Sequence, residues 1–429
     1  MKTTMNRILA EDVSYSTSEK YPVRNQNVAV IGAPGTGKTQ FVQKTALLSE
    51  AVNGNRSVVV SDPKGSLAGQ FTELFRKNGY QVLQIDFTDL AHSPDSWNPM
   101  DEITVDPESG EVNHQDIERI SAALIANDCR TDPYWDNAAR QFLSILIGFC
   151  MKRVIREECN LTACARLLSA MNQNRFDTLM EDYAAIYPDD VLNLRWETVK
   201  TVMKADRTWG CICSMLSTHL DIFLNESADR FFSRKERIHL SEIGRQKTAL
   251  FITVSDSDRS YNRMITLFYT QLFQELIKAA NLNMDFRLAV PVHIYMDDFA
   301  CGGGGCIPDF ASIIACIRSR AISCDIVLQT FQQLEDLYGP SAAATILSCC
   351  DRHIYLGGMD YKTADEIAVR LNMPPEKVLS LPLNKAVYME RGSKARIVGK
   401  STLKQHPLYG KLLECRTENK AIENERRLV

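Results

Sequence analysis

The sequence contains no apolar run long enough to cross a membrane. Its longest apolar stretches, such as Phe142–Met151, fall well short of the roughly 18–20 residues that a membrane helix needs. The first residues lack the apolar core of a signal peptide, and no low-complexity tract is present. The formal charge of −4 excludes a strongly basic chain that coats nucleic acid everywhere, although a local basic channel is compatible with it. We therefore expect a globular cytoplasmic chain without a transmembrane helix.

The cysteines show neither the spacing of a metal site nor that of a disulfide framework. All thirteen are scattered, without a CxxC pair and without a histidine cluster at zinc-ligand spacing. The closest approaches are Cys211/Cys213, Cys301/Cys306 and Cys349/Cys350. In a chain without an export signal, this pattern predicts free thiols in a reducing cytosol and no zinc.

Short apolar runs alternate with helix-length segments at both ends of the sequence. The runs are Asn27–Ile31, Ser57–Ser61, Gln81–Ile85, Ala249–Val254, Val290–Met296, Cys324–Leu328 and His353–Leu356. Nearly continuous apolar strands separated by helices indicate a parallel sheet that is buried on both faces. From about residue 113 to residue 235 only helical periodicity is present.

These patterns predict an α/β fold with a mainly parallel central sheet, interrupted in sequence by an all-α insertion domain. The length of 429 residues suits two or three domains. The α/β domain is expected over residues 25–105 and 240–405, and the insertion domain over residues 106–239. Residues 1–24 form an N-terminal extension. Residues 406–429 are expected to be a polar C-terminal tail, either a solvated helix or disordered.

The strongest motif is GAPGTGKT at Gly32–Thr39, which fits the phosphate-binding loop GxxxxGK[ST]. An apolar strand precedes it and a helical pattern follows it, so a chance glycine turn is a poor alternative. Gly35 and Gly37 can adopt the backbone angles that turn successive N–H groups toward a phosphate. Lys38 is placed to reach the β- and γ-phosphates of ATP, and the hydroxyl of Thr39 to bind Mg²⁺.

An acidic pair follows a later strand, as a P-loop site requires. The apolar run Val290–Met296 leads directly into Asp297 and Asp298. Asp297 is expected to hold Mg²⁺ through water, and Asp298 to orient or deprotonate the attacking water. The alternative is a helix N-cap followed by a solvated acid.

Three further segments carry weaker signals. Asp62 and Lys64, in the sequence Asp-Pro-Lys-Gly, lie at the strand edge where α/β sheets bind ligands, and a turn with an N-cap aspartate explains them equally well. Gln329 is either a sensor of the γ-phosphate or a turn residue. Arg318 and Arg320 are either solvated helix ends or reach the γ-phosphate of a neighbouring subunit. The candidate nucleotide-binding residues are Gly32, Gly35, Thr36, Gly37, Lys38, Thr39, Asp62 and Lys64.

Several segments stand in a distinctive order along about residues 25–400. They are GAPGTGKT, SDPKGSL, GYQVLQIDF, DSWNP, DPYWDNA, KTALFITVSDSD, FYTQLFQEL, YMDDFA, IPDFASIIACIRSRAIS, LQTFQQL and LGG. This order resembles that of the TraG/TraD-like coupling proteins of type IV secretion systems, the conjugative DNA-transfer ATPases, especially those of Gram-positive mobile elements.

The resemblance implies a RecA-like motor domain with an all-helical insertion and a homo-hexamer around a central channel. It also implies ATP hydrolysis coupled to moving single-stranded DNA and its relaxase toward the membrane channel proteins of a type IV secretion system. The family's P-loop, Walker B acids and glutamine fall on Gly32–Thr39, Asp297, Asp298 and Gln329. The arginine that acts across the subunit boundary in related hexamers corresponds best to Arg320, and next to Arg318.

Two departures from the family pattern leave alternatives open. The second Walker B acid is usually glutamate, and the shorter Asp298 is compatible with slow hydrolysis. Typical members carry N-terminal membrane helices, whereas this sequence begins about thirty residues before its P-loop; we expect a partner to recruit it to the inner face of the membrane. The alternatives to a coupling motor are a nucleotide-binding docking protein with weak hydrolysis and a related FtsK/HerA-type hexameric DNA or protein translocase.

The densest basic stretch lies near the C-terminus. It consists of Arg391, Lys394, Arg396, Lys400 and Lys404. Such a stretch is a candidate lining for a DNA channel, because lysine and arginine bind phosphates largely without sequence preference. A solvated face is the ordinary alternative.

Overall fold

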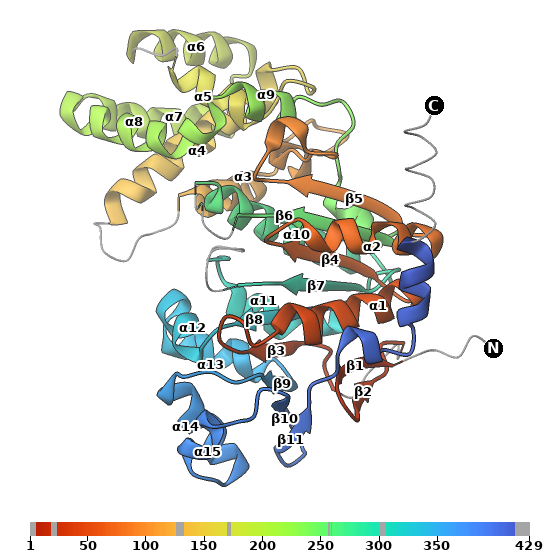
Figure 1. Cartoon of the computed structure of the whole chain (residues 1–429). Coiled ribbons are helices and arrows are strands. Elements are labelled where there is room, and N and C mark those ends of the chain that lie inside the picture. Colours follow the sequence, from red (N-terminus) through yellow and green to blue (C-terminus); the bar gives the residue numbers. More distant parts are fainter. Residues whose placement is uncertain are drawn as a thin grey trace. The chain divides into compact units, whose positions relative to one another are not determined.

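The fold is built on a mainly parallel β-sheet with helices packed along its strands (Figure 1). The computed structural model describes residues 6–18, 24–125, 133–169, 173–255, 258, 260–299 and 306–416. Within these residues the sheet has nine strands, in the order β11-β10-β9-β3-β8-β7-β4-β6-β5. They are β3 (Val28–Ile31), β4 (Ser57–Asp62), β5 (Gln81–Asp86), β6 (Thr248–Thr253), β7 (Val292–Met296), β8 (Ile322–Leu328), β9 (Arg352–Tyr355), β10 (Lys385–Glu390) and β11 (Arg396–Gly399).

The strands from β9 to β5 are all parallel, and β10 and β11 extend the sheet in antiparallel pairing. Every residue of β3, β4, β7 and β8 is buried, as strands covered on both faces require. The parallel strands coincide with the apolar runs found in the sequence, so the predicted α/β class is confirmed. In Figure 1 the strands that precede the helical region, red to orange, interleave with those that follow it, green to blue.

The helices of this α/β unit pack on the sheet through apolar faces. They are α1 (Lys44–Asn53), α2 (Ser66–Lys77), α10 (Asn262–Asn281), α11 (Phe310–Cys316), α12 (Phe331–Tyr338), α13 (Pro340–Ser348), α14 (Tyr361–Leu371) and α15 (Pro375–Leu379). In α2 the buried residues Leu67, Leu74 and Phe75 each lie three or four positions from the buried Phe71. These side chains belong to one hydrophobic cluster with residues of β4 and β6.

A second compact unit, residues 88–239 with residues 263–271 of α10, is helical. Its other helices are α3 (His114–Leu124), α4 (Pro133–Arg153), α5 (Leu161–Ser169), α6 (Gln173–Ile186), α7 (Val191–Met203), α8 (Asp206–Leu220) and α9 (Glu226–Phe232). No strand lies in the part of this unit that the structure describes; Val105 and Val112 form an isolated bridge. Aromatic rings pack in its core, with Phe142 4.7 Å from Trp209 between ring centroids.

The contacts place the start of the helical unit at residue 88, whereas the sequence pattern places it at residue 106. Trp97 shows why, because its buried ring packs edge-to-face on Phe268 with 5.1 Å between centroids. The Asn98 side chain also donates a hydrogen bond of 2.9 Å to the carbonyl of Cys159. Contacts between residues so distant in sequence leave no trace in local periodicity.

The C-terminal segment differs from the expected polar tail. A 3₁₀ turn, η7 (Leu403–Gln405), leads into helical residues 409–416. Leu408, Leu412 and Cys415 are buried in the hydrophobic cluster that contains α1 and α2. Because they are spaced by four and three residues, these side chains lie on one face of the helical segment. The polar residues between them make the segment look solvated when only its composition is considered. The expectation of a solvated tail is therefore wrong up to residue 416, and residues 417–429 lie outside the described part.

The sequence also led to expectations about membrane helices, cysteines and metal sites. No helix in the described residues is long and apolar enough to cross a membrane. The cysteines that the structure describes are free, and no group of His, Cys, Asp and Glu side chains suited to a metal ion is found among the described residues. Cys301 and the glycine run Gly302–Gly305 lie outside the described residues.

Candidate nucleotide-binding site

The loop after β3 has the conformation of a phosphate-binding loop. Gly35 and Gly37 have φ angles of +80° and +90°, which L side chains rarely adopt. A Cβ atom at Gly37 would meet the Phe41 ring at 2.3 Å, so only glycine fits there. The chain then enters a π-helical turn, η1 (Lys38–Gln43), which continues into α1. The helical segment therefore begins at Lys38, and its free N–H groups face the loop.

Thr36 and Gly32 brace this loop. The Thr36 hydroxyl donates to the carbonyl of Ala33 at 2.7 Å. A Cβ atom at Gly32 would lie 2.6 Å from the same hydroxyl oxygen, so the loop closes tightly on itself. Neither residue lines the cavity in front of the loop, whereas Gly35, Gly37, Lys38 and Thr39 do. Gly32 and Thr36 therefore shape the loop, whereas the other four predicted residues face the cavity.

The cavity has a volume of about 450 Å³ and lies at the carboxyl ends of the strands. Besides the loop, its lining includes the predicted residues Asp62, Lys64, Asp297, Asp298 and Gln329. Asp62 is the last residue of β4, and the other four follow β4, β7 or β8. Separate segments of the sequence therefore meet at one sheet edge, because parallel strands end on the same side.

Two predicted Mg²⁺ ligands lie next to each other in this cavity. The Thr39 hydroxyl is 3.5 Å from the Asp297 carboxylate. Burial raises the pKa of Asp297 to about 6, and the neighbouring Asp298 adds to this effect. One carboxylate and one hydroxyl form the partial ligand set typical of Mg²⁺ held jointly with phosphates, so the residues fit that ion. A bound cation would favour the ionised form of Asp297.

Asp298 sits on a tight turn after β7. Its φ angle is +46°, and its N–H donates to the Asp297 side chain at 3.0 Å. The N–H of Phe299 then donates to the carbonyl of Val327 at 3.0 Å, which fixes the far end of the turn. The Asp298 side chain is half-buried and lines the cavity. The structure therefore fixes the backbone of Asp298 at the edge of the cavity.

Asp62 acts as a cap for α2. Its carboxylate accepts hydrogen bonds from the N–H groups of Ser66, Leu67 and Ala68 at 3.1, 2.6 and 2.9 Å. Burial raises the pKa of Asp62 and these backbone bonds lower it. Gly65 occupies the N-cap position of α2, and the Asp62 carboxylate binds the first turn of the helix from three residues before it. Asp62 also lines the cavity, and its part in nucleotide binding stays a prediction. Lys64 in the same turn is exposed and lines the cavity.

Gln329 follows β8 and lines the cavity, with its backbone N–H held by the Gln333 side chain at 3.1 Å. Lys38 donates a hydrogen bond of 2.8 Å from Nζ to the carbonyl of Gly32.

Lys44 also lines the cavity, and the sequence motif did not indicate it. Its only sequence signal is a position about two helical turns after Lys38.

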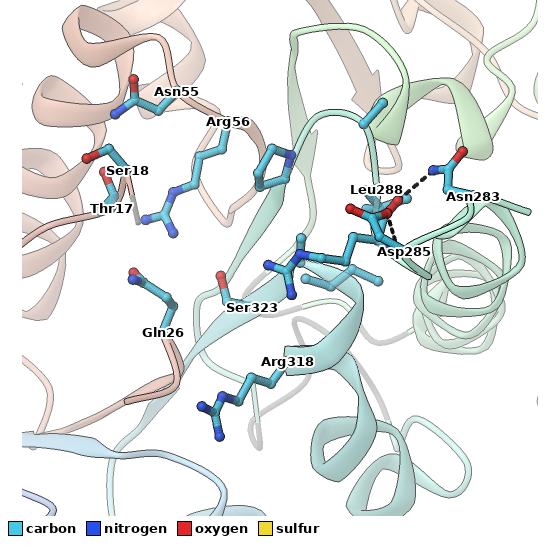
Figure 2. A pocket seen from close by; sticks show the side chains of 15 residues that line it. Thr17, Ser18, Gln26, Asn55, Arg56, Asn283, Asp285, Leu288, Arg318 and Ser323 are labelled. Carbon is cyan, nitrogen blue, oxygen red and sulfur yellow. Dashed lines mark hydrogen bonds between the residues drawn. The ribbon is translucent and has the colours of Figure 1, made fainter. Parts of the chain in front are cut away.

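The two candidate arginines lie at the opposite edge of the sheet. Arg320 precedes β8 and donates to the carbonyl of Cys316 at 3.0 Å and to the Asn281 side chain at 3.3 Å. Arg318 lines a second cavity of about 460 Å³, on the side of Gln26 and Ser323 (Figure 2). The described lining of the P-loop cavity contains lysines but no arginine. Within one chain, the structure does not bring Arg318 or Arg320 to the P-loop.

The basic stretch near the C-terminus divides into two kinds of side chain. Arg391, Lys394, Arg396 and Lys404 are exposed. Lys400 is only 7% exposed, and its ammonium contacts the back of the P-loop. Lys400 is therefore unsuited to line an open channel.

Sheet and site together define the class of protein. A P-loop after β3 and an acidic pair after β7, with β8 between the two strands, make a RecA-like P-loop nucleotide-binding domain. The family model described as "Type IV secretory system Conjugative DNA transfer" matches residues 3–373. The chain belongs to this family.

Solved structures agree on the fold. The plasmid coupling protein TrwB in complex with the ATP analogue ADPNP has a TM-score of 0.63 and 14% identity, covering 88% of this chain and 85% of that one. TrwB in complex with ADP and Mg²⁺ has a TM-score of 0.62, 14% identity and the same coverage. VirB4 of Thermoanaerobacter pseudethanolicus has a TM-score of 0.55 and 15% identity, covering 90% of this chain and 91% of that one. No curated protein sequence matches the chain.

Proposed function

We propose that the chain is an ATP-driven coupling motor that docks single-stranded DNA with its relaxase and moves both toward a type IV secretion channel. One observation carries the enzymatic part of this proposal. The neighbours Lys38 and Thr39 line one cavity at the carboxyl edge of the sheet together with Asp297, which lies 258 positions from Thr39 in the sequence. Membership of the conjugative DNA-transfer family supports the choice of cargo.

In this proposal each residue of the cavity has a separate task. The P-loop N–H groups and Lys38 hold the β- and γ-phosphates of ATP. Thr39 and Asp297 hold Mg²⁺, which neutralises phosphate charge when bound. Asp298 orients the attacking water, and Gln329 lies on the γ-phosphate side. The complexes of TrwB with ADPNP and with ADP and Mg²⁺ support nucleotide binding by this fold.

The position of the arginines supports completion of the site by a second subunit. The described cavity lining holds no arginine, and Arg318 and Arg320 lie at the other edge of the sheet. In a homo-hexamer, this edge of one subunit would face the P-loop cavity of the next. An arginine supplied in trans contributes about 10³–10⁵ in rate to P-loop enzymes, so hydrolysis would depend on assembly.

The DNA-binding residues we propose are the exposed members of the basic stretch. Arg391, Lys394, Arg396 and Lys404 are exposed in the structure. Arg391 also pairs with Asp351 at 2.9 Å, which leaves the other three as the better phosphate contacts. A small number of phosphate contacts is consistent with the net charge of −4, because the chain has no general excess of basic residues.

DNA-stimulated ATP hydrolysis by the purified chain tests the motor. We expect hydrolysis to rise at least several-fold with single-stranded DNA and to be lost in Lys38→Ala, because the phosphates lose their lysine. The Lys377→Ala variant is the matched control, because Lys377 is exposed and lies outside the cavity lining, and it should retain stimulation. If DNA neither binds nor stimulates, the motor proposal fails. Stimulation by duplex DNA alone would favour a FtsK/HerA-type translocase instead.

One observation favours a second function, a nucleotide-binding docking protein with weak hydrolysis. Asp298 stands where the family usually has glutamate, and its side chain is one methylene shorter on a backbone turn with a φ of +46°. A shift near 1 Å costs about 10²-fold in rate. We expect Asp298→Glu to raise kcat by about tenfold or more with little change in KM for ATP, measured at saturating DNA. An unchanged kcat would remove the argument for a docking protein.

A further inference from the structure

Lys400 is a buried cation without an acidic partner in the described part of the chain. It follows β11, and its residue is 7% exposed. Its ammonium donates to the carbonyl of Thr36 at 3.1 Å and to that of Leu356 at 2.8 Å. It also lies 5.4 Å from the centre of the Phe41 ring. Burial lowers the pKa of Lys400, so the chain sustains an unfavourable desolvation at this position.

The position of the ammonium bears on the conformation of the P-loop. The peptide unit between Thr36 and Gly37 is planar and trans, so its C=O and N–H point in opposite directions. Lys400 holds the C=O on the rear side of the loop. The N–H of Gly37 therefore points to the front, and Gly37 lines the cavity there. This is the direction from which a P-loop binds phosphate.

Lys400 is itself held firmly. Its backbone N–H donates to the carbonyl of Asn384 at 2.9 Å, and the carbonyl of Gly399 accepts from Glu11 at 2.9 Å. Leu356, the other acceptor of its ammonium, donates its N–H to the carbonyl of Ile31 at 2.8 Å. One ammonium therefore links the P-loop to the ends of β9 and β11.

We propose that Lys400 is a positioning residue for the P-loop: it keeps the Thr36 carbonyl behind the loop and thereby aims the Gly37 N–H at the nucleotide's β-phosphate. A second positive charge behind the loop adds to the attraction of the phosphates. The proposal rests on the nucleotide site proposed above. It extends that site to a residue that lies 364 positions from Thr36 in the sequence.

Steady-state ATP hydrolysis with DNA separates this role from a merely structural one. The Gly37 N–H contacts the β-phosphate in both ground state and transition state, so its loss weakens both equally. We expect Lys400→Met to raise KM for ATP about tenfold and to leave kcat within about threefold. Titration with ADP should show a similar loss of affinity. Lys400→Arg, which retains a cation and N–H donors, should recover much of the loss.

Lys411→Met is the matched control, because Lys411 is exposed on the helical segment that follows and lies outside the cavity lining. It should leave KM unchanged. A variant that only lost folded protein would show a lower apparent kcat with an unchanged KM, and that result for Lys400→Met overturns the proposal. An unchanged KM and kcat also overturns it.

Lys400→Gln, which keeps uncharged N–H donors, is measured in the same way if the methionine variant does not fold. If neither variant folds, Lys400 is a residue of the fold and the proposal is wrong. Lys38→Ala separates a failure of the proposed nucleotide site from a failure of the proposed role of Lys400. If that variant binds and hydrolyses ATP like the unmodified chain, the nucleotide site itself is wrong, whatever Lys400 does.

Discussion

Single residues around the P-loop have roles that their contacts decide. Asp62 and Asp297 are both buried aspartates at the end of a strand. The Asp62 carboxylate accepts hydrogen bonds from three backbone N–H groups of α2, whereas the Asp297 carboxylate lies next to the Thr39 hydroxyl in the cavity. The same residue type at the same sheet edge thus serves as a helix cap in one case and as a cation ligand in our proposal in the other.

The two loop glycines provide a prediction at this scale. Gly35 and Gly37 both have positive φ, but a Cβ atom at Gly35 would meet nothing within 4 Å, whereas one at Gly37 would meet the Phe41 ring. We expect Gly35→Ala to cost about 1–2 kcal/mol of stability for the backbone conformation alone. Gly37→Ala should cost more and should also abolish ADP binding, because Phe41 must move. Urea unfolding and ADP titration measure the two effects; equal stability of both variants would contradict the argument.

At the scale of elements, the N-terminal hairpin is attached to the centre of the sheet by buried charge. The hairpin consists of β1 (Arg7–Ala10) and β2 (Val13–Tyr15). Arg7 is fully buried and pairs with Asp325 of β8, which also contacts His293 of β7 at 2.9 Å. Although burial alone raises it, the Arg7 guanidinium and His293 hold the pKa of Asp325 well below its usual range. The described residues of the expected N-terminal extension are thus packed into the core of the α/β unit.

Removing one partner of this pair should destabilise the α/β unit. Arg7→Met leaves the Asp325 carboxylate buried without its cation, which costs about 3–5 kcal/mol in buried pairs. The double variant Arg7→Met/Asp325→Asn removes the charge as well and should recover part of that loss. Urea unfolding of both variants and of the unmodified chain tests the coupling. A double variant less stable than Arg7→Met would show that the pair is not the source of the effect.

At the scale of the whole molecule, buried titratable groups make stability depend on pH. Burial lowers the pKa of His293, His353 and His406 to about 4 in each case. His406 is held neutral by its contacts, since its Nδ1 accepts from the Leu408 N–H at 3.1 Å. Burial raises the pKa of Asp297, so protonation of this group as the pH falls favours the folded state instead.

We expect the chain to lose stability as the pH falls from about 7.5 to 5.5. Over this range the unfolded histidines, with pKa values near 6.5, take up protons that the folded ones do not, which costs about 1 kcal/mol for each histidine. Asp297 takes up a proton more readily in the folded state than in the unfolded state, so it stabilises the folded chain over this range. Its contribution offsets somewhat less than the loss caused by one histidine. Thermal unfolding at the two pH values measures the net loss. The His406→Asn variant should show a smaller loss than the exposed control His92→Asn, and an equal loss would contradict the assignment.

Local and periodic features of the sequence were sufficient for much of this picture. The predicted parallel strands are confirmed, and the structure has a glycine loop after β3 and two acids after β7 where the sequence motifs lie, because each of these features depends on a short stretch of chain. Apolar runs form strands wherever both faces are covered, and glycine alone suits the positive φ angles at Gly35 and Gly37. The helical region between residues 113 and 235 was equally visible from its period.

Only the tertiary structure decided which distant side chains meet. It assigned Asp62 to a helix end, placed Arg318 and Arg320 away from their own chain's P-loop, and brought Lys400 to the back of that loop. It also buried Leu412 of the supposed tail. Each of these outcomes depends on contacts between segments tens to hundreds of residues apart. Local sequence patterns do not encode such contacts, because the packing of the whole sheet determines them.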